Sequence, residues 1–446
     1  MIGVVQNILR IPELKKKIFV TIALLFVYRV GFHVPIPGMN FRALAEKIQA
    51  QYSGAVGSFL GLLDVFSAGD FQSGALFSLG IMPYISASII FSLLAKVVPA
   101  LEKVAKEGQA GQKKINQYTR YLTPLLCVFQ SFLVVKGVIP NLLAAKIYVI
   151  DPEVYHTFWW QTHAILALTT GTIFLMWLGE QITEYGIGNG ISMLIMAGIV
   201  ARMPVSIWRY LASAGELADK AWHSLILIAL FVGVIVVVIY ITKGQRRVLI
   251  QAARFTRGQK VFGGQRHYLP LKVNQPGVMP VIFASSLLIF PSAFFQWVGL
   301  DPLADALHRS TGWWYISIYI TLIFFFSFFW NSLMIQPTEM ANNMKEYGSF
   351  IPGIRPGRKT AEYIETIMMH MTLAGAAFLS VIALVPQIVA DSLQVPVALS
   401  SFLGGTSILI VVGVALDLVD KVNSHLLMRN YEGFMRRGSG GGTFGR

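Results

Sequence analysis

The chain has 446 residues, of which 55% are hydrophobic and only 13% are charged, and its formal net charge is +14. Average soluble domains contain about 25% charged residues. A water-soluble fold is therefore excluded, because apolar side chains in this excess must face hydrocarbon. The single cysteine, Cys127, excludes an intrachain disulfide and a thiolate metal cluster. These features indicate an integral membrane protein.

Seven long uncharged runs predict transmembrane helices, since each of them is long enough to cross a bilayer. They are 71–95, 154–179, 221–242, 273–300, 310–338, 366–390 and 392–416. Three weaker runs complete the set: 18–36, which Arg29 interrupts, 121–135, which is short, and 185–201. No small-residue cleavage pattern follows the run that begins at residue 18, so we interpret it as a retained helix and not as a signal peptide. The runs together predict an all-α membrane protein of about ten spans.

Positive charge is divided unevenly between the loops that connect these predicted helices. If the loops are assigned alternately to two sides, most of the 36 Lys and Arg residues fall on the side that holds the amino terminus. The positive-inside rule then places this side in the cytoplasm. Because the number of predicted spans is even, we expect both termini to be cytoplasmic.

The segment 57–80 differs from its neighbours, because glycines and two acids, Asp64 and Asp70, interrupt an otherwise apolar run. It is too polar to span a bilayer and too apolar for an ordinary solvated loop. A short re-entrant helix fits this composition, since such backbone is tolerated at membrane depth where protein or a water-filled cavity surrounds it. A plain external loop is the alternative.

Two predicted cytoplasmic loops, 243–272 and 339–365, are long and basic. The first contains Lys and Arg but no acidic residue. A loop of this kind can be a topology signal that contacts only anionic lipid. Its length exceeds what a topology signal requires, so a docking surface for an acidic partner is the second interpretation.

Enzymes and solute transporters are the competing classes of function. The sequence contains no HExxH helix and no GxxxxGK[ST] phosphate loop, and we see no paired intramembrane Asp or Ser and His dyad. We therefore predict no enzymatic activity, no metal site and no cofactor. A secondary transporter of small solutes is the alternative function. Transporters usually carry ionisable groups near the bilayer midplane, however, whereas these predicted spans are uncharged at their centres.

A series of motifs lies on alternating helices and loops along nearly the whole chain. They are VPIPG at 34–38, LGIMPYISASII at 79–90, KINQYTRYLT at 114–123, GEQITEYGIGNGISMLI at 179–195, GQRR at 244–247, YLPLKVN at 268–274, IFASS at 282–286, FIPGIRPG at 350–357 and FLGGTSILIVVGVALD at 402–417. In this order they resemble the SecY family, the channel subunits of the bacterial protein translocase, called Sec61 alpha in eukaryotes.

The resemblance implies two inverted halves of five helices, 1–210 and 211–430, around a central pore, followed by a glycine-rich cytoplasmic tail at 431–446. It also implies the central protein-conducting channel of the Sec translocon in the cell inner membrane, which moves unfolded preproteins and releases membrane helices sideways into lipid. The implied partners are the SecE and SecG subunits, the SecA motor ATPase, the ribosome, preprotein signal sequences and membrane lipid.

The resemblance further implies a seal made of two parts. Six isoleucines match the family's pore ring, a narrow apolar constriction that blocks ions because it dewets. Within it, the spacing of four residues puts each of two pairs on one helix face. The pore ring is Ile81, Ile85, Ile191, Ile195, Ile282 and Ile410. The segment 57–70 resembles the family's plug, with Leu60, Gly61, Leu62, Leu63, Asp64, Val65 and Phe66.

Two further sets of residues follow from the resemblance. The family opens sideways at a lateral gate, whose polar residues here are Ser92, Gln130, Ser285 and Ser286. Serine in a membrane helix also commonly bonds its own backbone. The residues that match the binding surface for the ribosome and SecA are Arg246, Arg247, Arg254, Arg257, Lys260 and Arg355. Arginine suits both partners, because its planar fork binds phosphate and carboxylate at two points.

Overall fold

A computed structural model describes residues 11–39, 75–144, 150–212, 217–252, 254–257, 260–263, 266–285, 287–288, 312–393 and 405–439. The chain divides into two compact units. The first unit comprises Met1–Ser206 and Val414–Arg446, and the second comprises Ile207–Gly413. The plug residues predicted within 57–70 lie outside the described residues.

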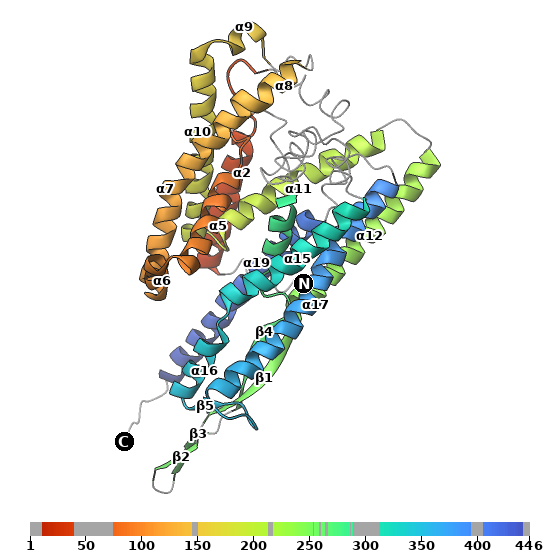
Figure 1. Ribbon diagram of the computed structural model, residues 1–446. Coiled ribbons are helices and arrows are strands. Elements are labelled where there is room, and N and C mark those ends of the chain that lie inside the picture. Colours follow the sequence, from red (N-terminus) through yellow and green to blue (C-terminus); the bar gives the residue numbers. More distant parts are fainter. Residues whose placement is uncertain are drawn as a thin grey trace. The chain divides into compact units, whose positions relative to one another are not determined.

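The first unit is a bundle of helices (Figure 1). Its helix α7 packs against α5 and α10, and α10 also packs against α2. Its helices are α2 (Pro12–Gly31), α5 (Met82–Val97), α6 (Pro99–Lys106), α7 (Gln109–Leu133), the π-helical turn η2 (Val134–Val138), α8 (Ile139–Ala144), α9 (Pro152–Tyr155), α10 (Phe158–Tyr185) and most of α11 (Gly190–Ala212). Proline occupies the first turn of α2, α5 and α6. There its fixed φ suits a helix, and its missing N–H would have no helical acceptor.

The chain bends by 102° between α5 and α6. Val98, the residue at the bend, is extended, with φ −94° and ψ 114°. A residue before proline is disfavoured in the α conformation, so Pro99 ends α5 and at the same time begins α6. The sequence position of this proline therefore sets the end of the predicted span 71–95.

The second unit combines long helices with strands. Helix α17 packs against α15, α12 and α16, and Figure 1 shows α15 and α17 running side by side. Its helices are α12 (Leu217–Lys243), α15 (Trp313–Met334), α16 (Pro337–Glu346) and α17 (Arg358–Ser392), and the first part of α19 (Gly405–Ser439) also belongs to it.

The basic loop 243–272 forms strands, which the all-α prediction did not include. Strands β1 (Gln245–Ala252) and β4 (Arg266–Lys272) pair in an antiparallel ribbon, with Gln245 opposite Lys272. Between them in sequence, β2 (Arg254–Arg257) pairs with β3 (Lys260–Gly263). The short β5 (Ser349–Phe350) adds to β1, so the sheet order is β4-β1-β5. The two loops predicted as basic therefore share one sheet, although 339–365 contains four Lys and Arg and four Glu, so only 243–272 has a net positive charge.

Helices long and apolar enough to span a membrane are present, although not every predicted span is described. Within the described residues, five helices are long and apolar enough to cross a membrane, and a sixth span results if the bent pair α5 and α6 counts as one. The weaker runs 18–36 and 121–135 are largely helical, in α2 and α7. The run 273–300 is helical at 279–285 and 287–288, and its residues 286 and 289–300 lie outside the described residues.

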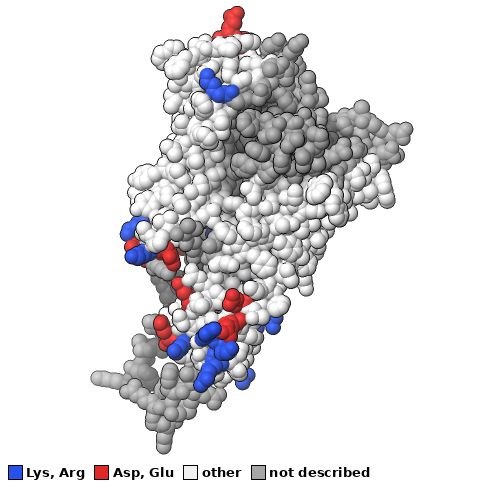
Figure 2. All heavy atoms as spheres, viewed as in Figure 1, with Lys and Arg blue, Asp and Glu red and all other residues white. Residues whose placement is uncertain are grey.

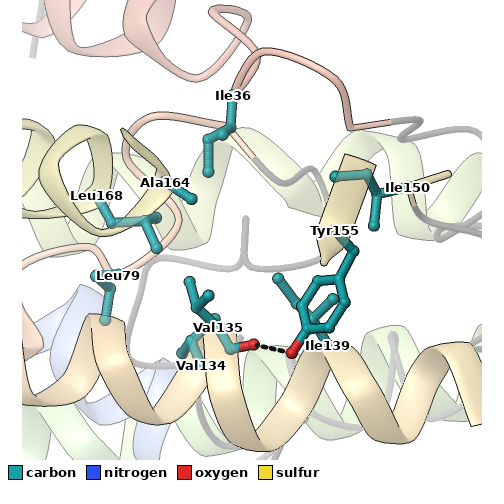
Figure 3. Packing of buried hydrophobic residues seen from close by; sticks show 9 residues of the cluster. All are labelled: Ile36, Leu79, Val134, Val135, Ile139, Ile150, Tyr155, Ala164 and Leu168. Carbon is teal, nitrogen blue, oxygen red and sulfur yellow. Dashed lines mark hydrogen bonds between the residues drawn. The ribbon is translucent and has the colours of Figure 1, made fainter. Parts of the chain in front are cut away.

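Buried side chains form a separate cluster at one end of the first unit, around α7, η2 and α10 (Figure 3). Tyr155 lies 6% exposed in it, and its hydroxyl donates a hydrogen bond of 3.2 Å to the carbonyl oxygen of Val135 within η2. A π-helical turn displaces its carbonyls from the regular α pattern, so this bond satisfies one of them. Trp160 Nε1 donates to the carbonyl oxygen of Pro37 (2.8 Å) and fastens the start of α10 to the end of the VPIPG motif.

The approach of α10 to the segment before α5 depends on a glycine. A Cβ built on Gly171 would lie 2.1 Å from the carbonyl oxygen of Leu76, and backbone cannot yield as a side chain can. We expect Gly171→Ala to destabilise the protein by about 1–3 kcal/mol, the range for overpacking. The matched control is Gly233→Ala on α12, where nothing lies within 4 Å of the new Cβ. Thermal unfolding in detergent should show a lower Tm for Gly171→Ala only, and equal Tm values would contradict the close packing.

Candidate functional site

Four of the six residues predicted to form the pore ring meet in one apolar cluster of the first unit. Ile81 is buried at the N-cap of α5, and Ile85, Ile191 and Ile195 are partly buried against the same cluster. The other buried side chains of this cluster come from α2, α10, α11 and the segments just after α2 and before α5, and they include Tyr28, Phe77 and Leu178. The periodicity of the sequence put each pair on one helix face, and the fold brings the two faces together.

The two remaining pore-ring residues belong to the second unit. Ile282 lies in the helical segment 279–285, where its N–H donates to the carbonyl oxygen of Val278 (3.2 Å). Ile410 lies on α19 and is 6% exposed. All six residues are apolar, and each lies on a helix or at the cap of one.

The gate residues are described in part. Ser92 is exposed on α5, and its hydroxyl donates to the carbonyl oxygen of Ser88 (2.7 Å) one turn earlier. Ser285 likewise donates to the carbonyl oxygen of Ile282 (2.9 Å). Both serines therefore satisfy their hydroxyl donors on their own helices. Gln130 is partly exposed on α7, next to which α5 packs, and Ser286 lies outside the described residues.

An ion pair that the sequence analysis did not assign joins two of the quoted motifs. Arg120 on α7 pairs through Nε with Glu180 on α10, and the glutamate side chain is only 24% exposed. Nearby on α7, Lys114 Nζ donates a hydrogen bond of 2.8 Å to Glu107, which raises the pKa of the lysine. The ion pair of Arg120 and Glu180 joins α7 to α10 in the part of each helix where the sequence is polar.

The predicted basic residues lie at one end of the second unit. Arg246 and Arg247 are exposed on β1, and Arg254, Arg257 and Lys260 belong to the β2 and β3 hairpin, in which Arg257 is opposite Lys260. On the face shown in Figure 2, charged side chains gather around α16 and the start of α17, while most of the helical surface is uncharged.

Arg355 is exposed in a tight turn just before α17. Gly353 and Gly357 have φ of 84° and 103°, a conformation that favours glycine. The Thr360 hydroxyl donates to the carbonyl oxygen of Arg355 (3.0 Å), and Ile354 packs on a buried cluster below. The turn is thus held on both sides, and the guanidinium is left accessible.

This buried cluster connects the turn to the ribbon. Its side chains come from β1, β4, the residues after β5 and the first turns of α17, and it consists of Val248, Leu271, Ile351, Ile364, Ile367 and Met368. Arg246 and Arg355, from loops about a hundred residues apart in sequence, are therefore presented by one small folded layer. These features are typical of a polytopic helical membrane protein, with an apolar cluster in the first unit and a basic surface at one end of the second unit.

Comparisons with known proteins identify this class further. The sequence model of the SecY family matches residues 75–419. The chain is 42% identical over 438 residues to the protein translocase subunit SecY of Thermotoga maritima, and the match covers 97% of each chain. It is 40% identical to the protein translocase subunit SecY of Escherichia coli K12, over 95% of this chain and 94% of that protein. The chain belongs to the SecY family.

Solved structures show the same fold. A protein-conducting channel aligns with a TM-score of 0.60 at 17% identity, over 92% of each chain. Sec61 in the canine ribosome-channel complex aligns with a TM-score of 0.56 at 16% identity, also over 92% of each chain. The family resemblance inferred from the motifs is confirmed by the SecY family model and the SecY relatives, and these structures show that the fold is shared.

Proposed function

We propose that this chain is the central protein-conducting channel of a Sec translocon, moving unfolded preproteins across the cytoplasmic membrane and releasing membrane helices into lipid. Membership of the SecY family supports the proposal, because close relatives are protein translocase subunits. The observation that carries it in the structure is the cluster in which Ile81, Ile85, Ile191 and Ile195 meet. The comparisons give the alternative, a transporter of small solutes, no support.

The finer architecture belongs to the same proposal. Ten transmembrane helices form two five-helix halves, 1–210 and 211–430, and both termini lie in the cytoplasm, as the loop charges support. Residues 57–70 act as the plug, and the lateral gate involves Ser92, Gln130, Ser285 and Ser286. SecE and SecG are its companion subunits.

The basic layer of the second unit is the proposed docking surface. Its exposed arginines, on the ribbon and in the Arg355 turn, suit the phosphates of ribosomal RNA and the carboxylates of the SecA motor. The similarity to Sec61 in a ribosome-channel complex supports the first of these partners. Energy from ATP enters through the motor, since the sequence contains no GxxxxGK[ST] loop.

Crosslinking tests the proposed pore directly. Cys127 is the only cysteine of the chain and is buried, so Cys127→Ala provides a cysteine-free background. We expect single cysteines at the six pore-ring positions to crosslink to a secretory polypeptide arrested halfway, because the chain must pass the constriction. Leu379→Cys, at a buried position of α17 outside the apolar cluster of the first unit, is the matched control and should not react. Absence of crosslinks at all six ring positions would contradict the pore.

A further inference from the structure

Hydrogen bonds close the turn between α10 and α11, next to the proposed pore-ring residue Ile191. Asn189 Oδ1 accepts from the N–H groups of Ile191 (3.1 Å) and Ser192 (3.3 Å). Asparagine thus caps α11 at its first turn. The backbone of Ile191, a pore-ring residue, is therefore bonded to the turn itself.

Two threonines attach this turn to its surroundings. Thr183 on α10 donates to the carbonyl oxygen of Gly179 (2.9 Å) and accepts from the N–H of Gly190 (2.8 Å). Thr21 on α2 donates to the carbonyl oxygen of Lys17 (2.9 Å) and accepts from the N–H of Ile187 (3.1 Å). Thr21 is 5% exposed and Ile187 is 4% exposed, so water cannot easily replace this second bond.

Backbone contacts leave the turn little room to move. A Cβ on Gly190 would lie 1.8 Å from the carbonyl oxygen of Gly179, and one on Gly179 would lie 3.0 Å from Ile191 Cγ1. A Cβ on Gly186 would lie 2.5 Å from Thr21 Oγ1. The Ile191 side chain therefore rests on the backbone of α10, and Thr21 rests on the turn. A shift of the turn necessarily shifts Ile191.

We propose that Thr21 is a positioning residue for the pore ring and thereby a determinant of signal-sequence specificity. It holds the turn, and through it Ile191 and Ile195, against the cluster with Ile81 and Ile85. Apolar contacts alone are non-directional. The hydrogen bond from the N–H of Ile187 to Thr21 Oγ1 is directional, so it fixes the position of the turn relative to α2. This inference rests on the proposed function, because it takes the ring to be the seal that a signal sequence must open.

Removal of the acceptor at Thr21 tests the inference. Valine keeps the shape of threonine but leaves the buried N–H of Ile187 unpaired, which favours the displaced turn by about tenfold. In vesicles with the complete translocase, we expect Thr21→Val to raise export of a preprotein with a defective signal, relative to the intact preprotein, by about tenfold. Thr21→Ser keeps the oxygen and should retain the wild-type ratio. Thr183→Val should have a smaller effect, because Thr183 is more exposed.

The matched control is Thr170→Val on the same helix as Thr183. Thr170 is exposed and donates only to the carbonyl oxygen of Leu166 (2.7 Å) within α10. Its export ratio should not change. Gly186→Ala provides a second route to a displaced turn, because the new Cβ would lie 2.5 Å from both Thr21 Oγ1 and the carbonyl oxygen of Ile182. Gly233→Ala, in open space, is its control.

Each outcome distinguishes a positioning role of Thr21 from a purely structural one. An unchanged ratio in Thr21→Val, or an equal loss of export with intact and defective signals, would show a purely structural role and overturn the positioning proposal. Failure of both Thr21→Val and Gly186→Ala to accumulate would do the same. Ile191→Asn separates the proposed function from the inference. If it raises the ratio while Thr21→Val does not, only the inference fails, and if Ile191→Asn has no effect, the ring assignment itself is wrong.

Discussion

Arg355→Glu should reduce motor-driven export at least about tenfold while the channel still assembles. One charge-assisted hydrogen bond at a docking surface contributes about 1.5–3 kcal/mol, and reversal of the charge adds repulsion. The side chain is exposed, and the turn is held by the Arg355 carbonyl, the two glycines and Ile354. The substitution therefore leaves the local fold intact. The measurement is ATP-dependent uptake of a preprotein into vesicles, normalised to the amount of channel.

The matched control for this prediction is Arg358→Glu. Arg358 is three residues away, its side chain is 92% exposed, and it pairs with Glu362 on the same helix. The change in net charge is identical, so the control separates the specific contact of Arg355 from the general positive field of the layer. Normal export with Arg355→Glu would remove this residue from the docking surface, and an equal loss in both variants would show that only the field matters.

Asparagine in the pore ring should have the opposite effect, a gain of unselective export. Ile282→Asn or Ile410→Asn places an amide in the constriction, which binds water and lowers the barrier that keeps the closed channel dry. We expect export of a preprotein with a defective signal to rise at least about tenfold, because a buried unpaired amide costs the closed state about 1–3 kcal/mol. Ion conductance of the idle channel should rise as well.

Volume-conserving replacements are the controls for this second prediction. Ile282→Leu and Ile410→Leu keep an apolar surface of the same size and should retain the wild-type selectivity. Ile410 is 6% exposed, so the amount of channel in the membrane must be measured for both of its variants. Tight discrimination in the asparagine variants at normal channel levels would argue against a seal made by these side chains.

The membrane segments and the family were predictable from the chain alone. Uncharged runs such as 221–242 and 366–390 correspond to α12 and α17, because a helix in lipid satisfies its own backbone and needs only local apolar sequence. Motifs such as GEQITEYGIGNGISMLI are also local, and their order identified the family that the comparisons confirm. The spacing of four residues between Ile81 and Ile85 predicted, without tertiary information, that the two side chains share one helix face.

The strands in 243–272 were missed for a physical reason. The most prominent feature of this segment is its positive charge, and its apolar stretches, such as Val248 to Ile250 in β1, are short. Stretches this short do not show the alternation of apolar and polar residues that predicts a strand. Strand β1 also pairs with β5, which comes from the loop 339–365. A local sequence pattern does not predict pairing between segments so far apart in the chain. The resemblance placed Arg246 and Arg355 in one binding surface, but no local sequence pattern showed that one folded layer presents both residues.

Local physics, then, accounts for which segments enter the bilayer and which family they belong to, because hydrophobicity and helix formation act over a few neighbouring residues. Packing between distant segments accounts for the rest. Thr21 and Ile187 are 166 residues apart, and their hydrogen bond exists only because α2 lies beside the turn after α10. The same holds for the cluster of Ile81 and Ile191, since apolar side chains have no directional preference for one another until the backbones bring them into contact.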